Sequence, residues 1–326
     1  MPRVGTGAGA GGDDADGDRI RALPDGDLLH ALGFLPARDA VRTCVLGRLW
    51  GNQWRALPRL RITGAEKLHM FVNQLVLLRY PGLVLDECEI DLRGLGYANR
   101  MHVNLWIRHA LLLRARVLCL RWIPGLQSQP LASMFLKVLH LVGVSFEGNI
   151  IDFSSCPALE DLEITSSEID AHVISSPSAK RLRLVKCSFI LCPCPDYRTR
   201  ISTPSIICLE VEDCSGFPHL LQSMPSLHTA SVCVGCFDED EWEESCSVGE
   251  RVDGSVLLGG LPNATNLMFR ASFGIMRDSN PMFQPLLLRQ LKRVDVKCVK
   301  IDERVHRTLK TIYSALGHRP IFIQEN

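Results

Sequence analysis

The sequence predicts an α/β protein in which a short N-terminal helical module is followed by a solenoid of parallel strands. Two observations support this fold class. The first part of the chain has apolar residues at helical spacing, with proline and glycine at the helix boundaries. From residue 60 onward, pairs of apolar residues separated by one residue recur at regular intervals. The length of 326 residues suits about two domains.

The bulk composition argues against several classes of protein. Hydrophobic residues make up 46% of the chain and charged residues 22%, as in ordinary globular proteins. The formal net charge is zero, so we expect no nucleic-acid partner. No stretch is long and apolar enough for a transmembrane helix, and the N-terminus lacks the apolar core of a secretory signal. We therefore expect the 13 cysteines to be reduced, in the nucleus and/or the cytoplasm.

The helical module is predicted over residues 18–60 as three short helices. Pro24 and Pro36 suit the first turns of the first two helices, and Gly33 ends the first. The third is expected after Gly47. Helices this short are not stable alone in water, so they must pack on each other and on a partner.

The preceding residues 1–17 are mostly glycine, alanine and aspartate. They contain too little apolar surface to offset the entropy of ordering, so we predict that they are disordered.

The second domain, residues 61–326, is predicted to contain irregular leucine-rich repeats. Most of its apolar pairs lie 20 to 27 residues apart, which is the period of such repeats, and each pair marks one parallel strand. We expect roughly eight to ten repeats. The pairs are Leu60-x-Ile62, Leu83-x-Leu85, Leu118-x-Leu120, Leu139-x-Leu141, Leu162-x-Ile164, Leu182-x-Leu184, Leu209-x-Val211, Leu267-x-Phe269 and Val294-x-Val296, with a degenerate one at Ala230-x-Val232.

Longer segments between the pairs have recognisable causes. Residues 66–80 and 100–113 are predicted to be helices, and residues 237–250 an acidic insertion. The C-terminal part, about 291–326, resembles a cap with a helix from Asp302 and a last strand at 321–323. A solenoid needs such a unit to cover its final apolar edge.

The helical module resembles a known family. Residues 23–46 read LPDGDLLHALGFLPARDAVRTCVL and are followed by Trp50 and Trp54. This run resembles the F-box of plant F-box/LRR proteins, the substrate-recognition subunits of SCF-type ubiquitin ligases. The tail from Leu291 to Cys298 is similar to the end of grass members. Two positions depart from the family pattern: Gly47 replaces the usual serine, and Leu49 interrupts the usual basic pair.

The resemblance implies an adaptor role. An F-box docks on a Skp-type adaptor, which joins cullin and RING subunits, while the repeat domain binds a protein target. Eight Arg against three Asp between Arg19 and Arg61 suit an acidic adaptor, although a solvated face would look the same. The residues that the resemblance assigns to adaptor binding are Leu23, Pro24, Leu28, Leu32, Leu35, Val41, Cys44, Leu46 and Trp50.

Other readings of these residues remain open. The leucines of residues 23–46 could be the core of a generic three-helix bundle, and the repeats could belong to a ligand- or protein-binding receptor without a ligase role. A zinc site could be built from the cysteines between Cys187 and Cys236. We expect no metal instead, because Cys88, Cys187 and Cys214 each stand three residues after an apolar pair, the position where repeats place a small buried side chain.

No catalytic motif is recognisable in the sequence. It has no phosphate-binding glycine loop, no G-x-S-x-G elbow and no H-E-x-x-H helix. We therefore expect no enzyme activity and no cofactor. Cys192-Pro193-Cys194-Pro195 is expected to form an extended surface loop. The target cannot be deduced from the sequence.

Overall fold

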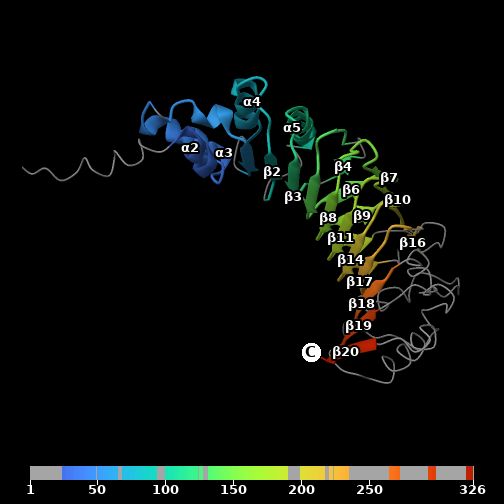
Figure 1. The fold of residues 1–326 in the computed structure, drawn as a ribbon. Helices are drawn as coiled ribbons and strands as arrows, with labels where there is room; N and C mark the ends of the chain where they lie inside the picture. The colour runs from blue at the N-terminus through green and yellow to red at the C-terminus, as the bar shows by residue number, and fades with distance from the viewer. Residues whose placement is uncertain are drawn as a thin grey trace, which may run out of the picture.

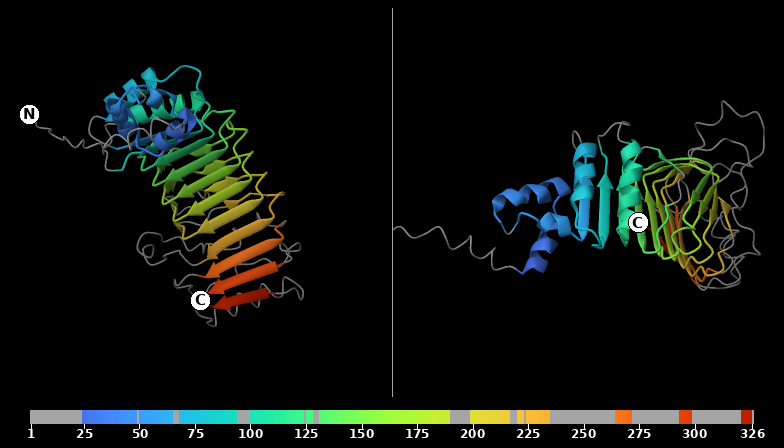
Figure 2. Two further views of the ribbon diagram at one scale, coloured as in Figure 1. Left: turned by 60° about the vertical axis from the view of Figure 1, so that its left-hand side comes forward. Right: turned by 90° about the horizontal axis from the view of Figure 1, so that it is seen from above.

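Figure 1 shows an elongated molecule with helices at its N-terminal end and a row of strands that continues to the C-terminus. Figure 2 shows the same row from the side and from above. The predicted disordered tail, the acidic insertion, the cap helix from Asp302, and the Cys192 loop lie outside the described residues and stay predictions. The computed structural model describes residues 24–48, 50–64, 68–93, 100–123, 125–127, 131–189, 199–216, 220–222, 224–234, 264–271, 293–298 and 321–325.

The described part of the N-terminal module contains two α-helices and two 3-10 turns. Helices α2 (Asp25–Leu32) and α3 (Ala37–Arg42) are each preceded by a proline, and α3 continues into η1 (Thr43–Leu46). The second 3-10 turn is η2 (Gln53–Ala56), which packs against α2. The first two predicted helices are therefore present where the sequence indicated them.

A third α-helix after Gly47 is not found among the described residues. The backbone φ of Gly47 is 151°, which residues with a Cβ rarely adopt, and the chain reverses there instead of starting a helix. A second glycine, Gly51, follows within one turn and weakens any helix further. Only the short turn η2 forms, and it places Trp54 in the core.

One parallel sheet of eleven strands forms the body of the solenoid. Neighbouring strands pair in register, so that Leu139 lies beside Leu118 on one side and Leu162 on the other. Each predicted apolar pair except the second lies in a strand, and the predicted last strand is β20. The strands, in order, are β1 (Arg59–Thr63), β2 (Glu87–Asp91), β3 (Val117–Arg121), β5 (Val138–Val142), β8 (Asp161–Thr165), β11 (Arg181–Val185), β14 (Cys208–Glu212), β17 (Thr229–Val234), β18 (Asn266–Ala271), β19 (Arg293–Cys298) and β20 (Ile321–Glu325).

The second strand lies further along the chain than predicted. Leu83-x-Leu85 is not a strand; the inward pair of β2 is Cys88 and Ile90. Leu85 is buried just before the strand, where its N–H donates to the carbonyl of Leu113. Cys88 therefore takes the position of a repeat leucine and not the turn position assigned to it from the sequence.

The return segments are of two kinds. Helices α4 (Leu68–Leu78) and α5 (Arg100–Leu112) complete the first two turns and confirm the two helices predicted there. None of the described helices is long and apolar enough to cross a membrane. The turns that begin at β5, β8, β11 and β14 instead use short strands in two further sheets. One sheet contains β4 (Leu126–Gln127), β6 (Ser145–Glu147), β9 (Glu168–Asp170), β12 (Ser188–Phe189) and β15 (Ser215–Gly216), and the other β7 (Ile150–Asp152), β10 (Val173–Ser175), β13 (Arg200–Ser202) and β16 (Leu220–Leu221).

A left-handed residue follows each central strand of the large sheet. Gly143, Ser166 and Lys186 have φ values of 63°, 49° and 54°. Their N–H groups donate to carbonyls of the next turn, as from Lys186 to Glu212 at 2.8 Å. This hydrogen bond links neighbouring repeats at the point where the chain leaves the sheet. Trp122 and Asp213 occupy the same position in their repeats.

The next residue of each repeat is small or apolar and buried. Cys187 and Cys214 occupy this position, which confirms the assignment made for them from the repeat pattern. The thiol of Cys187 donates to the carbonyl of Ile164 in the preceding turn. Ser167 occupies the equivalent position one repeat earlier, where its hydroxyl accepts the N–H of Val144 and donates to the carbonyl of Thr165.

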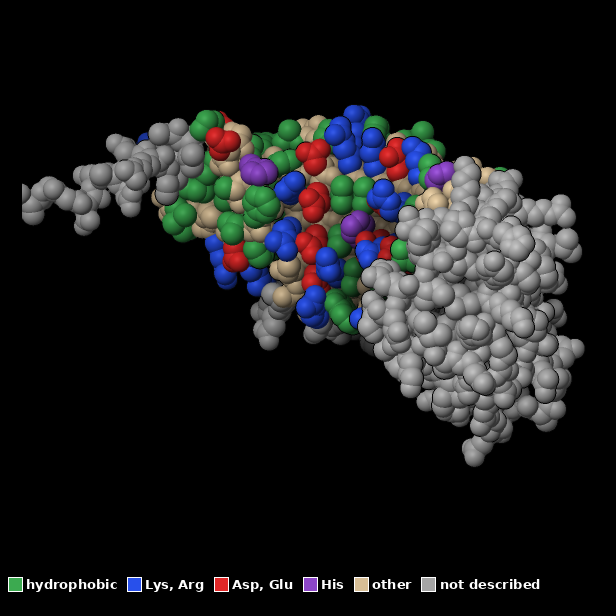
Figure 3. Space-filling view, turned by 60° about the horizontal axis from the view of Figure 1, so that its bottom comes forward, with side chains coloured by type: hydrophobic (Ala, Val, Ile, Leu, Met, Phe, Trp, Pro, Cys, Tyr) green, Lys and Arg blue, Asp and Glu red, His purple; other side chains and the backbone are tan. Residues whose placement is uncertain are grey.

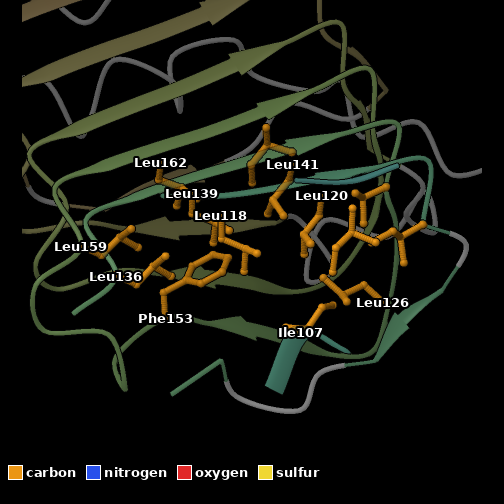
Figure 4. Close-up of a cluster of buried hydrophobic side chains, with 14 of the residues drawn as sticks. Ile107, Leu118, Leu120, Leu126, Leu136, Leu139, Leu141, Phe153, Leu159 and Leu162 are labelled. Carbon is orange, nitrogen blue, oxygen red and sulfur yellow. The ribbon is translucent and has the colours of Figure 1, made fainter. Parts of the chain in front are cut away.

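The core consists of columns of leucine side chains that point between the sheets. Figure 4 shows Leu118, Leu139 and Leu162 from successive strands, with Leu136 and Leu159 beside them. All five side chains are fully buried. Because the columns run through every turn, the buried residues form one continuous cluster from Leu28 to Leu267, and the N-terminal module shares this core with the solenoid.

The left-handed position provides a stability test. A Cβ on Gly143 would lie 2.7 Å from Trp122 Cε3, on a backbone with φ of 63°. We expect Gly143→Ala to lower the free energy of unfolding by about 1–3 kcal/mol. Lys186→Gly places glycine in the same left-handed conformation, which glycine adopts without the steric cost of a Cβ. We therefore expect the free energy of unfolding to be unchanged or higher by up to about 1 kcal/mol. Urea denaturation measures both, and equal destabilisation by the two variants would contradict the account.

Candidate interaction surfaces

The structure separates the predicted adaptor-binding residues into two groups. Leu28 and Leu32 are buried in the core between α2 and the rest of the module. At 1% and 2% exposure they contribute to the core of the module in this arrangement, and their assignment to adaptor binding stays a prediction. Leu23 lies outside the described residues. Val41 and Trp50 are half-buried and pack against the core.

The remaining predicted residues, Pro24, Leu35, Cys44 and Leu46, are exposed. Phe34 and Val45, which the sequence analysis did not single out, are exposed as well. We call these six residues the exposed apolar set: Pro24, Phe34, Leu35, Cys44, Val45 and Leu46. Val45 is 83% exposed and Leu46 67% exposed, and they lie on the single turn η1, which contains no buried residue. Two adjacent apolar residues in a short turn have no helical period, so spacing could not have identified Val45.

The joint between the two helices carries Phe34. Its ring makes an edge contact with His30, with ring centroids 5.0 Å apart, and the guanidinium of Arg59 lies 5.5 Å from its centroid. Arg61 donates from Nη1 to the Phe34 carbonyl at 2.9 Å. The exposed apolar set is thus attached directly to the first strand of the solenoid.

A second candidate surface is the solvent-facing side of the large sheet. Figure 3 shows acidic and basic side chains intermixed across the middle of this view, with hydrophobic side chains near the grey N-terminal segment. Glu89 on β2 bridges two strands: Oε2 accepts from Arg61 Nε at 2.8 Å, and Oε1 accepts from Arg121 Nε at 3.0 Å. The Glu89 side chain is only 14% exposed.

The same pattern continues on the following strands. Glu163 lies 3.9 Å from His140 Nδ1 and 3.6 Å from Arg183 Nη1. Arg183 Nε lies 2.9 Å from Glu210 Oε2. Basic and acidic side chains therefore face each other across several pairs of neighbouring strands. Such a face presents fixed hydrogen-bonding groups with little net charge, which suits selective recognition of a protein surface more than of nucleic acid.

The described cysteines have structural positions. Burial raises the pKa of the Cys88 thiol to about 12, although the nearby Arg79 guanidinium opposes the shift. Burial also raises the pKa of Cys119 and Cys156. Among the described residues, no three or more His, Cys, Asp or Glu side chains are arranged to hold a metal ion. Cys192, Cys194 and Cys236 lie outside those residues.

Comparison with known proteins identifies relatives over much of the chain. No family model matches the sequence. An F-box/FBD/LRR-repeat protein of Arabidopsis thaliana is 26% identical over 258 residues, which cover 67% of this chain and 60% of that protein. A putative F-box/LRR-repeat protein of the same plant is 24% identical over 305 residues, covering 85% of this chain and 68% of the relative.

A rice protein, the meiotic F-box protein MOF of Oryza sativa subsp. japonica, is 30% identical over 196 residues, or 52% of this chain and 41% of that protein. The chain is a homologue of plant F-box/LRR-repeat proteins. It spans about three fifths of the length of the first Arabidopsis relatives that it matches: 60% in each of two cases.

The homology agrees with both halves of the structure. The parallel solenoid is an LRR-like domain, with the left-handed turn and the small buried residue at the same place in successive repeats. The F-box resemblance falls on the module that carries the exposed apolar set. The described part of the chain therefore has two candidate surfaces of different chemistry, one apolar and one charged.

The bridging role of Glu89 can be tested by mutation. Glu89→Gln leaves two partly buried guanidinium groups without a carboxylate, so we expect the free energy of unfolding to fall by about 1–3 kcal/mol. Asp86→Asn removes a 3.9 Å pair between exposed side chains and should cost less than about 0.5 kcal/mol. Thermal and urea unfolding measure both values; a loss from Asp86→Asn as large as from Glu89→Gln would count against this assignment.

The buried thiol of Cys88 predicts a pH dependence. The unfolded chain loses this proton near the usual pKa of 9.0, whereas the folded protein keeps it up to about 12. Stability from this group is complete below pH 9 and is lost as the pH rises above it, by at most about 1.4 kcal/mol per pH unit. We expect Cys88→Ala to flatten the decline in urea midpoint between pH 9 and 10.5. The exposed Cys44→Ala should keep the wild-type slope, and identical slopes for all three proteins would exclude this explanation.

Proposed function

We propose that the chain is the substrate-recognition subunit of a cullin-RING (SCF) ubiquitin ligase. Its F-box, residues 18–60, binds a Skp-type adaptor and through it the cullin and RING subunits. Its LRR domain, residues 61–326, binds a protein target for ubiquitination. The observation that carries the proposal is the exposed apolar set on a module whose sequence resembles an F-box, in a homologue of F-box/LRR-repeat proteins.

The exposed apolar set suits the adaptor contact. Exposed apolar side chains close together in sequence mark interaction sites, and a few such anchors contribute most of the affinity of an interface. Val45 and Leu46 provide the most exposed anchors, and Phe34 and Leu35 provide a second pair at the joint between α2 and α3. The half-buried Val41 and Trp50 pack against the core, and we assign them a positioning role for these anchors.

Direct contacts between the N-terminal module and the large sheet support the proposal. Arg61 links the Phe34 carbonyl to Glu89 on the sheet face, and Arg79 donates to the Leu57 carbonyl at 2.6 Å. The continuous core joins the same parts. A ligase subunit that performs no bond chemistry contributes by holding its target at a fixed position relative to the ubiquitin donor, and this contribution depends on rigidity.

The charged sheet face is the proposed target surface. Its paired charges around Glu89 and Glu163 define a fixed pattern that a target must match, because unmatched charges lose their solvation on binding. The proposal requires no cofactor and no metal, and it places the protein in the nucleus and/or the cytoplasm. The target itself is not identified by this chemistry.

The alternative function is an LRR receptor or scaffold that binds a ligand or protein without a ligase role. The sheet face supports it equally well, since that surface does not depend on the F-box. The two functions differ in one property, which is binding to a Skp-type adaptor.

Co-purification with a plant Skp-type adaptor tests the proposal. We expect the wild-type chain to bind it and Val45→Asp/Leu46→Asp to weaken binding by roughly 30-fold or more, since the loss of even one central anchor costs about 2 kcal/mol. Ile150→Asp/Ile207→Asp, a matched pair of exposed apolar residues on the solenoid, should bind as the wild type does. If the folded wild-type chain does not bind the adaptor, the proposal fails and the receptor function is favoured.

A further inference from the structure

The first strand of the solenoid, β1, carries two partly exposed arginines, and both contact Phe34 in the exposed apolar set. The guanidinium of Arg59 lies 5.5 Å from the centroid of the Phe34 ring, within the range of a cation–π contact. Arg61 donates from Nη1 to the Phe34 carbonyl at 2.9 Å. One arginine therefore holds the ring and the other holds the backbone of the same exposed residue.

Each arginine is held in turn by a glutamate of the neighbouring strand. Glu87 lies beside Arg59 in the register of β1 and β2, and the Arg59 Nε lies 3.3 Å from its Oε2. Glu89 lies beside Arg61, whose Nε donates to Glu89 Oε2 at 2.8 Å. Two parallel chains of contacts thus run from the acidic strand β2 through β1 to Phe34.

The joint that carries Phe34 is also packed closely against β1. A Cβ on Gly33, the residue before Phe34, would lie 3.3 Å from the Cβ of Arg59. The Phe34 ring makes a further edge contact with His30, with 5.0 Å between the ring centroids. The Phe34 side chain is nevertheless 54% exposed. It is therefore an exposed apolar side chain that is already held in one place before a partner binds.

We propose that Glu87 and Glu89 are positioning residues for adaptor binding, which act on Phe34 through the two arginines of β1. The inference rests on the proposed function. Ordering a free side chain at an interface costs affinity, and a side chain that is already held in its bound position avoids that cost. The adaptor site then depends on two solenoid residues that lie outside residues 18–60, the predicted F-box.

The sign of the effect separates positioning from charge. The arginine-rich segment from Arg19 to Arg61 suits an acidic adaptor, and removal of acids from β2 makes its surroundings more positive. An acidic adaptor would then bind more tightly, because opposite charges attract. Loss of positioning has the opposite result, since the Phe34 side chain must be ordered again on binding. Weaker binding after loss of these carboxylates therefore does not come from charge alone.

Isothermal titration calorimetry of the full chain with a plant Skp-type adaptor tests the inference. We expect Glu87→Gln/Glu89→Gln to weaken binding roughly three- to tenfold, because the ordering of one side chain is lost. The same double change should have less than about a twofold effect in a Phe34→Ala background, where the ring that it positions is absent. Glu160→Gln removes an exposed ion pair with Lys180 in the middle of the solenoid, and this control should bind as the wild type does. Circular dichroism at the assay temperature checks that each variant is folded.

The possible failures are distinguishable. If the wild-type chain does not bind the adaptor, the proposed function fails and the positioning role fails with it. If the wild type binds and the double glutamine variant binds equally well or more tightly, only the positioning role is overturned. Val45 and Leu46 remain in the Phe34→Ala background, so its binding stays measurable. An equal loss with and without Phe34 would show that the glutamates act through stability or charge, and this result, or an equal loss from Glu160→Gln, would also overturn the positioning role.

Discussion

The structure depends on the straight register of its parallel strands. Each strand places its inward side chains directly beside those of the next, so that leucines stack in columns and backbone groups are paired laterally. Each repeat buries its apolar side chains only against its neighbours. The register also aligns the outward residues, which explains why charges on β2, β3, β8, β11 and β14 fall into rows and pair across strands.

The first turns differ from the later ones because helices replace the short return strands. A helix covers more apolar surface than a two- or three-residue strand, and α4 and α5 cover the part of the core beside the N-terminal module. The module in turn supplies Leu28, Leu32 and Trp54 to that core. The N-terminal module is therefore an integral part of the solenoid and not a separately folded unit, as the hydrogen bond from Arg61 to the Phe34 carbonyl also indicates. In the proposed ligase, this continuity would transmit the position of the adaptor to the target surface.

Much of the fold could be predicted from the sequence, because alternation of apolar and polar residues is a local signal. It located the large-sheet strands apart from β2, where a cysteine stands in place of leucine and the leucine pair at residues 83–85 was mistaken for the strand. Residue type could not reveal the left-handed turns either, since Trp122 and Lys186 adopt them as Gly143 does. Those conformations are stabilised by hydrogen bonds that the N–H groups of these residues donate to carbonyls of the next repeat, about twenty residues away in sequence.

The candidate site was predicted less completely, for a related reason. Helical spacing shows that Leu28 and Leu32 share one side of a helix, but it cannot show whether that side meets the protein's own core or a partner. In the proposed ligase, the Skp-type adaptor binds η1 and the joint before α3. Hydrogen–deuterium exchange of the full chain with and without a Skp-type adaptor tests this directly. With the adaptor bound, we expect slower exchange at residues 34–35 and 43–48 and unchanged exchange in β8 and β11. Protection confined to the solenoid strands, or no protection at all, would contradict the proposed adaptor contact.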